Sequence, residues 1–521
     1  MRISTQVVTQ KADLLFTALL AGTLVVLNLI FVGNVGINLA DEGFLWYGVI
    51  HTAQGQVPLR DFQSYDPGRY YWTVAWSSLF GTGILGVRYA LVVFQGFGLW
   101  LGILAARKVI PDRWFLSLVA VLLIVWMFPR HKLFEHSVTM AAVYVGACLL
   151  ESPSLLRHFL AGGFVGSAAF IGVNHGMYTG VAFSCLLLFI QYRTSSCESL
   201  WKCASVWGVG ILCGYVPMLF MFFSCPGFAG RYLDLLLNIW RRGTTNLPLP
   251  VPWPWQVDYL AVDWLTGVTA FVVGLAFCIL PLFYGTALVL LLWRRGDVRR
   301  QSVFIASTFV GLVYMQYAFS RADLSHLAQS IHPLLLGLVA LPTMCEPTRS
   351  RRTALGIILV ALGLSLFPAY RGSPLFSTCI WRGQGCVLYV INGEELWLAE
   401  SEKIGLERLR TVMTQHVIDT EGIFIAPHAP GLYCVLQKDS PVWQTYFIFP
   451  EQAEDEEIMI EALRTKKIRW ALVGDVALDG REELRFRHTH TLVWQYVRQE
   501  FEPVEVEGLP LHYQLFRRKA F

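Results

Sequence analysis

The chain has 521 residues, of which 55% are hydrophobic, 14% aromatic and only 15% charged, and its formal net charge is +4. Water-soluble domains cannot bury this much apolar side chain, so the composition indicates a membrane protein that crosses the bilayer several times. The net charge is small and the basic residues cluster beside apolar segments, which argues against nucleic acid as a partner. Residues 1–12 are polar and no clear cleavage site follows, so we expect the first apolar run to be retained.

Apolar runs that approach the length needed to cross a bilayer recur up to residue 370. We predict eleven spans, near 14–34, 84–106, 114–128, 138–150, 158–173, 177–192, 203–224, 264–293, 302–319, 327–344 and 353–370. With the N-terminus inside, the short loops "ARKVIPDR", "ESPSLLRH", "QYRTSSCESLWK", "WRRGDVRR" and "PTRSRR" become cytoplasmic, and nearly all are basic, as orientation by positive charge requires. Residues 68–81 are short and rich in Tyr and Trp, so we assign them to an interfacial helix; counting them as a span would move "ARKVIPDR" outside.

The character of the chain changes after the last apolar run. Short β-like runs ("GIFIAPH", "GLYCVL", "IRWALVGD", "HYQLFRR") then alternate with amphipathic helical stretches ("ESEKIGLERLRTVMTQHV", "EQAEDEEIMIEALRTKK", "TLVWQYVRQEF"). We therefore predict an α-helical polytopic membrane domain over 1–370, with its first exterior loop at 35–83, and a C-terminal α/β domain over 371–521. Eleven spans from an inside start place that domain outside the cytoplasm, where Cys379 and Cys386 could close a short disulfide.

The predicted exterior segments carry the chemically unusual residues. Each of these segments contains His, Arg, Asp or Glu: 35–83, 128–137, 173–178, 225–263 and 319–332. A single Arg or Lys at a membrane edge is most simply a snorkelling residue or a loop cap. Titratable groups in every segment of one face indicate a site on that face. The 225–263 loop begins with an amphipathic pattern and ends rich in Pro and Trp, so it is either a flap on lipid headgroups or a lid over the site.

The densest pattern follows the first span. It consists of Asp41, Glu42, Trp46, Gly55, Pro58, Asp61, Phe62, Pro67 and Gly68. This pattern resembles the polytopic C-type glycosyltransferases that use polyprenyl-phosphate sugars, among them protein O-mannosyltransferases and lipid A aminoarabinose transferases. "LFGTGILGVR" and "SRADLSHLAQSIHPLLLGL" are similar to two further segments of that family. The resemblance is most specific in 39–88, and it implies a transferase in the cell membrane that uses such a donor and a glycan, lipid or protein acceptor.

The resemblance implies that Asp41 is the general base that deprotonates the acceptor hydroxyl or amine. A sugar on a lipid phosphate already carries a good leaving group, so a carboxylate base and cations that neutralise the departing phosphate suffice. A single displacement needs no enzyme nucleophile, and the product should have inverted anomeric configuration. Glu42 and Asp61 are the alternative bases, and a helix cap or another structural role is the alternative for Asp41.

A second acidic residue near the donor is also implied by the resemblance. It corresponds to Glu135, with His136 beside it, although many relatives carry Asp just before the next span instead. The alternative for Glu135 is an ion pair with Arg130 or Lys132 at the membrane edge.

Four side chains at span edges are candidates for the donor phosphate, because guanidinium and other cationic groups bind phosphate well. They are Arg69, His175, Arg321 and His326. The resemblance places Asn174, His175 and Arg321 near the lipid phosphate, with loop capping as the alternative for each. No zinc spacing or CxxC pair is present. No motif predicts an organic cofactor. A divalent cation is the one cofactor for which the sequence leaves the question open.

Two other classes of function remain. A lipid-linked sugar transporter or flippase would be expected to show internal repeats and charges at mid-depth, and the sequence shows neither. A noncatalytic relative that binds a lipid-linked glycan would retain the same binding residues, so consumption of the donor is the observation that separates it from an enzyme.

Overall fold

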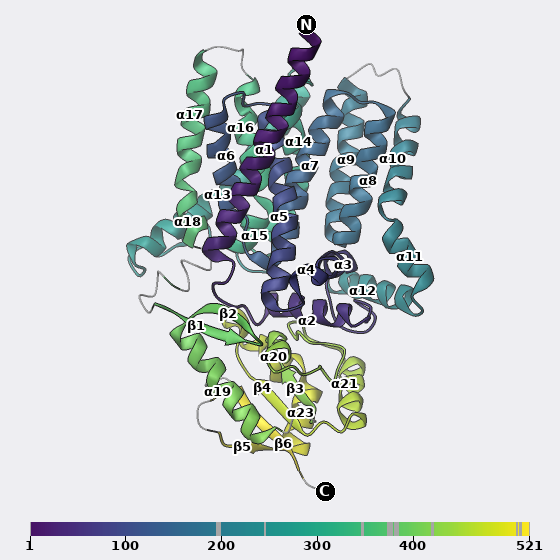
Figure 1. The fold of residues 1–521 in the computed structure, drawn as a ribbon, viewed down its shortest axis with the longest axis vertical. Coiled ribbons are helices and arrows are strands. Elements are labelled where there is room, and N and C mark those ends of the chain that lie inside the picture. Colours follow the sequence, from purple (N-terminus) through teal and green to yellow (C-terminus); the bar gives the residue numbers. More distant parts are fainter. Residues whose placement is uncertain are drawn as a thin grey trace. The chain divides into compact units, whose positions relative to one another are not determined.

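The structure is a computed structural model that describes residues 2–193, 199–243, 246–344, 349–371, 379, 385–417, 421–506, 509 and 513–519 (Figure 1). Parts of two predicted cytoplasmic loops, 194–198 and 345–348, and most of 372–384 lie outside these residues. The chain forms two compact units. Unit 1 comprises Met1–Gly33, Tyr89–Ser224 and Arg242–Phe376, and unit 2 comprises Asn34–Arg88, Cys225–Arg241 and Ser377–Phe521.

Unit 1 is a bundle of apolar helices. Its helices are α1 (Arg2–Val32), most of α5 (Ile84–Arg107), α6 (Arg113–Val125), η1 (Arg130–Lys132), α7 (Leu133–Glu151), α8 (Leu155–Ile171), α9 (Val173–Arg193), α10 (Leu200–Gly214), α11 (Val216–Ser224), η2 (Pro254–Gln256), α13 (Trp264–Trp293), α14 (Ser302–Ser320), α15 (Leu324–Ser330), α16 (His332–Ala340), η3 (Leu341–Met344), α17 (Arg349–Leu364) and α18 (Leu366–Arg371). Helices dominate because a span in hydrocarbon must satisfy its own backbone hydrogen bonds.

Each of the eleven predicted apolar runs is mainly helical in the part of the chain that the structure describes. Within those residues, seven helices are long and apolar enough to cross a membrane, and the total rises to nine if two bent pairs each form one span. The bent pairs are α10 with α11 and α15 with α16, whereas α6 and α8 are apolar but shorter. Large apolar side chains such as Leu19 on α1 (61% exposed) and Leu282 on α13 (68% exposed) face outward, as lipid-facing residues should. The chain is therefore a multi-pass membrane protein, and the total of eleven spans stays a prediction.

Small residues bring two of these helices into close contact. Gly162 and Gly166 of α8 lie against the backbone of α10, and a Cβ at either position would meet the carbonyl oxygens of Trp207 or Ile211. Reciprocally, Gly210 and Gly214 of α10 lie against the backbone of α8. Such small residues allow helices in a membrane to pack backbone to backbone.

Unit 2 contains the first predicted exterior loop together with the C-terminal α/β region. Its elements are α2 (Asp41–Ala53), α3 (Pro67–Ala75), α4 (Ser77–Phe80), nearly all of α12 (Phe228–Arg242), β1 (Cys386–Ile391), β2 (Glu394–Ala399), α19 (Glu400–His416), β3 (Ile423–Ala426), α20 (Gly431–Val435), α21 (Ala453–Thr465), β4 (Trp470–Gly474), η5 (Leu478–Gly480), η6 (Glu482–Leu484), α22 (Phe486–Thr489), α23 (Thr491–Glu500), β5 (Phe501–Val504) and β6 (Tyr513–Arg518). The predicted segments 68–81 and 225–263 contain helices α3, α4 and α12, and their position at a membrane surface stays a prediction.

The C-terminal strands form a four-stranded sheet of order β3-β4-β6-β5 and a separate β1-β2 hairpin. β3 and β4 are parallel, whereas β6 runs antiparallel to both of its neighbours. The sheet core is apolar and includes Phe424, Ala471, Phe486, Val493 and Phe516. The predicted α/β character of this region is therefore confirmed.

Two local predictions in this region have different outcomes. The run "GLYCVL" is not a strand, because Gly431–Val435 form the short helix α20. Every residue of α20 is buried, and a short run that is apolar on all sides carries no period that separates a strand from a helix. The predicted disulfide between Cys379 and Cys386 is confirmed.

Candidate functional site

The acidic pair predicted from the sequence begins helix α2. The side-chain oxygen of Asn38 accepts hydrogen bonds from the backbone N–H groups of Ala40 (3.0 Å) and Asp41 (2.9 Å). This local turn satisfies two backbone donors at the point where α2 begins, which is how Asn favours the start of a helix. Asp41 and Glu42 consequently occupy the first turn of α2, where the N-terminal end of the helix dipole favours carboxylates.

Glu42 is held in a buried ion pair. Its two carboxylate oxygens accept from Nε and Nη2 of Arg88, each at 2.8 Å. The side chains are only 2% and 1% exposed, and Nη2 of Arg88 also donates to the carbonyl of Gly36. A bidentate contact of this kind fixes the orientation of both side chains. The sequence pattern included Arg88 without assigning it a role, although a charge near the start of an apolar helix requires a partner.

Asp41 has different surroundings from its neighbour. Its side chain is half-buried, and Oδ1 accepts a hydrogen bond from the hydroxyl of Tyr446 at 3.0 Å. Tyr446 lies 405 residues further along the chain, in the C-terminal α/β region. Sequence reasoning missed Tyr446, because no local pattern connects residues at this separation. The structure therefore distinguishes two adjacent carboxylates, one in a buried ion pair and the other beside a phenol.

Two glycines allow α2 to approach the C-terminal region closely. A Cβ at Gly43 would lie only 2.5 Å from Cα of Gly431, and the backbone N–H of Gly431 donates to the carbonyl of Leu39 at 2.8 Å. Any side chain at either glycine would therefore push α2 and α20 apart.

His428 lies beside Tyr446 and close enough to Asp41 to interact with its charge. Its ring packs edge-on against Tyr446, with centroids 6.1 Å apart. Burial lowers the pKa of His428 to about 4, although the Asp41 carboxylate opposes the shift. His428 is consequently neutral at neutral pH, and its ring adds no charge next to Tyr446 and Asp41.

The other predicted residues of unit 2 stabilise the loop after α2. Nε and Nη2 of Arg60 donate to the two carboxylate oxygens of Asp61, at 2.8 and 2.9 Å. Asp61 also accepts from the backbone N–H of Val57, and its hydrogen bond with Arg60 lowers the pKa of its carboxyl. Arg69 is 6% exposed and its guanidinium lies over the ring of Tyr65. Asp61 thus orders a turn in this structure.

The second predicted acid lies in unit 1, in the first turn of α7. Glu135 is 2% exposed, and Lys132 approaches its Oε1 at 3.8 Å, which corresponds to one of the two ion pairs considered from the sequence. His136 is fully buried and its Nδ1 lies 3.1 Å from the carbonyl oxygen of Ala328. Its ring also meets that of His332 edge-on.

One of the two predicted residues on α9, His175, contacts another helix of unit 1. Nδ1 of His175 lies 3.0 Å from the hydroxyl of Tyr314 on α14, and His175 is 1% exposed. Asn174, beside it, is half-buried. His175 therefore has a hydrogen-bonding partner within the bundle.

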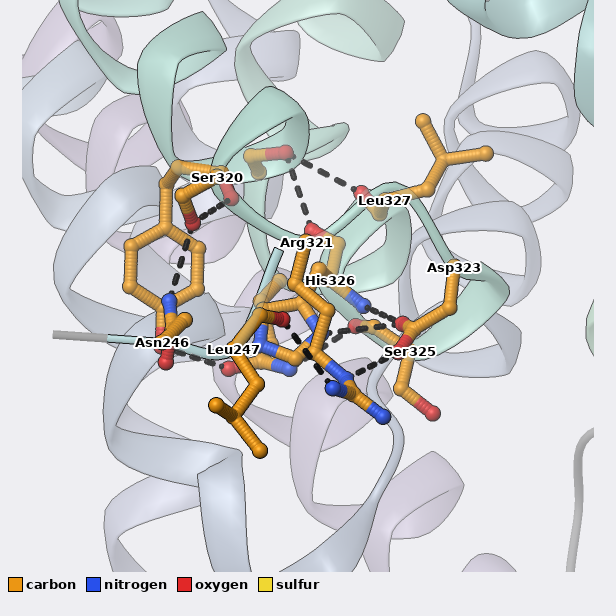
Figure 2. Close-up of polar contacts among 11 residues, drawn as sticks. Asn246, Leu247, Ser320, Arg321, Asp323, Ser325, His326 and Leu327 are labelled. Carbon is orange, nitrogen blue, oxygen red and sulfur yellow. Dashed lines mark hydrogen bonds and ion pairs between the residues drawn. The ribbon is translucent and has the colours of Figure 1, made fainter. Parts of the chain in front are cut away.

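Arg321 and His326 belong to one polar cluster at the turn between α14 and α15. Figure 2 shows Arg321 between Leu247 and Asp323: Nη1 donates to the Leu247 carbonyl and Nε to the Asp323 carboxylate, both at 3.0 Å. Asp323 also accepts from the backbone N–H and from Nδ1 of His326, at 2.8 and 2.9 Å. Burial raises the pKa of Asp323, but His326 and Arg321 together outweigh it and lower the pKa.

The predicted site residues thus form two groups. Unit 2 contains Asp41 and Glu42 on α2 and Asp61 and Arg69 on the following loop and helix, whereas unit 1 contains Glu135, His136, Asn174, His175, Arg321 and His326. In the described ranges, no group of three or more His, Cys, Asp or Glu side chains is arranged to hold a metal ion.

No protein-family model and no curated protein sequence matches the chain. The structure of ArnT from Cupriavidus metallidurans, solved bound to undecaprenyl phosphate, is similar to this chain, with a TM-score of 0.51 and 12% sequence identity. The alignment covers 99% of this chain and 98% of the ArnT chain. The apo oligosaccharyltransferase of Archaeoglobus fulgidus aligns with 96% of this chain and 75% of its own at 11% identity, with a TM-score of 0.48. The likeness to ArnT shows that this chain has the fold of the polytopic C-type glycosyltransferases, and the fold implied by the sequence resemblance is confirmed.

Proposed function

We propose that this chain is an inverting glycosyltransferase that moves a sugar from a polyprenyl phosphate to an acceptor, with Asp41 as the general base. The observation that carries the proposal is the difference between the two adjacent acids. Glu42 is committed to Arg88 in a buried pair, whereas Asp41 is half-buried and keeps one oxygen beside a neutral phenol. A carboxylate held by an arginine in a buried pair is a weak base, which favours Asp41 over Glu42 as the proton acceptor.

The proposed reaction is a single displacement. The acceptor oxygen or nitrogen attacks the anomeric carbon as Asp41 takes its proton, and the bond from that carbon to the phosphate oxygen breaks. The bonding electrons leave with the polyprenyl phosphate, whose added negative charge needs cationic partners. Attack opposite the leaving group inverts the anomeric configuration.

A lipid phosphate as leaving group is supported by fold likeness, since the ArnT of similar fold was solved bound to undecaprenyl phosphate. In this chain the proposed phosphate partners are Arg69 of unit 2 and His175, Arg321 and His326 of unit 1. Asn174, the sequence neighbour of His175, is proposed to assist them. Glu135 and His136 are proposed to line the donor side. The acceptor is a glycan, lipid or protein, and a divalent cation is the one cofactor left open.

The basic loops support a proposal for the location of the reaction. We propose a cell (inner or plasma) membrane location, with the transmembrane part over 1–370 and the C-terminal domain over 371–521 on the extracytoplasmic side. Positive loops stay in the cytoplasm, and an odd number of spans then carries the C-terminal domain across.

The proposed function is tested by incubating the purified protein in detergent with polyprenyl-phosphate sugars and candidate acceptors. We expect consumption of the donor, release of polyprenyl phosphate and a product whose inverted anomeric configuration is visible by NMR. Movement of an unchanged lipid-linked sugar across sealed vesicles, without donor consumption, would support a transporter and contradict the proposal.

Replacing Arg321 with Ala is expected to weaken binding of undecaprenyl phosphate about 10- to 100-fold, since a lost hydrogen bond to a charged group costs about 1.5–3 kcal/mol. Acceptor affinity should change less. Arg371→Ala is the matched control, because the Arg371 guanidinium also donates within unit 1, to Leu265 and Thr269. Equal affinities for the lipid phosphate in wild type and a folded Arg321→Ala variant would remove Arg321 from the phosphate site.

A further inference from the structure

The hydrogen bond from Tyr446 to Asp41 joins two segments of unit 2 that are remote in sequence. Tyr446 is half-buried in an irregular stretch of the C-terminal region, between α20 and α21. Its ring also lies against Phe44 of α2, with centroids 5.7 Å apart. The phenol is therefore held against the first turn of α2 by apolar contact as well as by the hydrogen bond.

The backbone at Tyr446 is clamped by Gln63, from the loop that follows α2. Oε1 of Gln63 accepts from the backbone N–H groups of Thr445 and Tyr446, both at 2.9 Å. Nε2 of Gln63 donates to the carbonyl of Tyr446 at 3.2 Å, and the backbone N–H of Gln63 donates to Trp443. One amide side chain thus satisfies three backbone groups around Tyr446, which restricts where its ring can lie.

Helix α2 is anchored to the same C-terminal region at further points. Besides the contact between Gly43 and Gly431, the hydroxyl of Tyr47 accepts from the backbone N–H of Ser440 at 3.0 Å. His51, one turn further on, lies 3.5 Å from the Asp439 carboxylate. These contacts hold Asp41 and Tyr446 in a defined relative position, so the hydrogen bond between them does not depend on one flexible side chain.

We propose that Tyr446 is a positioning residue that orients the carboxylate of Asp41, so that the C-terminal α/β region contributes to the catalytic site. This inference rests on the proposed function. The phenol donates a hydrogen bond to Oδ1 and fixes the rotation of the carboxylate about its terminal bond. The oxygen that takes the acceptor proton then keeps one direction relative to the substrate. Reacting groups need this preorganisation, since a displacement of about 1 Å can lower a rate about 100-fold.

The inference is tested with wild type, Tyr446→Phe, Asp41→Asn and the double variant, all purified as full chains. Tyr446→Phe keeps the ring and removes only the hydroxyl, so kcat for donor consumption should fall about 10- to 100-fold while KM stays nearly constant. In the Asp41→Asn background, Tyr446→Phe should cause no further loss, because the base that it positions is already absent.

Tyr433→Phe is the matched control. Tyr433 is a buried phenol of the same C-terminal region whose hydroxyl accepts from the backbone N–H of Ile425 at 2.8 Å. This variant should lower the unfolding temperature and leave kcat near the wild-type value. Comparable losses of kcat in Tyr433→Phe and Tyr446→Phe would indicate a general structural effect and overturn the inference.

Two other outcomes separate this inference from the proposed function. Suppose that wild type consumes the donor, but that Tyr446→Phe lowers the rate by the same factor in the wild-type and Asp41→Asn backgrounds, or does not lower it. The inference is then wrong, whereas the proposed glycosyltransferase function stands. If wild type consumes no polyprenyl-phosphate sugar while folded, the proposed function fails and the inference fails with it.

Discussion

Asp41→Asn should lower the turnover of lipid-linked sugar by a factor of about 10²–10⁴, the usual contribution of a general base. The amide is nearly the same size as the carboxylate and its oxygen can still accept from Tyr446, but it cannot take a proton at neutral pH. Folding and binding of undecaprenyl phosphate should therefore survive. Single-turnover rates and lipid-phosphate affinity, measured on the same purified variant, separate the two effects.

Asp61→Asn provides the matched control for this experiment. Asp61 belongs to the same sequence pattern, but its carboxylate is occupied by Arg60 and by the N–H of Val57. Its replacement should loosen the loop and reduce turnover much less than Asp41→Asn does. An Asp41→Asn variant that turns over near the wild-type rate, or a product with retained configuration, would direct the search for the base to Glu135.

Arg88→Leu should lower the free energy of unfolding by about 3–5 kcal/mol, the range found when one member of a buried ion pair is removed. Leu fills much of the volume but leaves the Glu42 carboxylate, 2% exposed, without its guanidinium partner. Denaturant-induced unfolding of the purified protein, followed by tryptophan fluorescence, measures the change.

The pair of Arg60 and Asp61 supplies the comparison, because both side chains are 29% exposed. Arg60→Leu should change the free energy of unfolding by no more than about 1 kcal/mol, as is typical of exposed pairs. Glu42→Leu combined with Arg88→Leu should recover much of the stability lost in Arg88→Leu alone, because no charge is then left buried. An Arg88→Leu variant as stable as Arg60→Leu would mean that water reaches Glu42.

Several features of the fold were predictable from the sequence because they depend on local physics. Apolar runs of about span length must be helical in a bilayer, since lipid offers no hydrogen-bonding partners, and each of the eleven runs is mainly helical in its described part. The strands around Ile423–Ala426, Trp470–Gly474 and Tyr513–Arg518 were likewise visible as β-branched and aromatic runs. The helix at Gly431–Val435 was misassigned, because its conformation depends on burial from all sides rather than on a period.

The hairpin of β1 and β2 was missed, although its turn carries a local signal. Asn392 and Gly393 both have positive φ, at 49° and 86°, and Asn-Gly favours this two-residue turn. In β2 the apolar content is diluted by Glu394 and Glu395, whereas β1 (Cys386–Ile391) is apolar throughout.

The sequence by itself determined the membrane character, the helical runs, the mixed character of the C-terminal region and the acidic pair at the start of α2, because composition and spacing act over a few residues. Only the tertiary structure decided what surrounds each acid. Arg88 is 46 residues from Glu42 and Tyr446 is 405 residues from Asp41, and either pairing exists only once packing has brought the segments together. The same holds for Arg321, which contacts the Leu247 carbonyl 74 residues away. Side-chain hydrogen bonds between distant segments leave no period in the sequence, so the partners that distinguish Asp41 from Glu42 had to come from the fold.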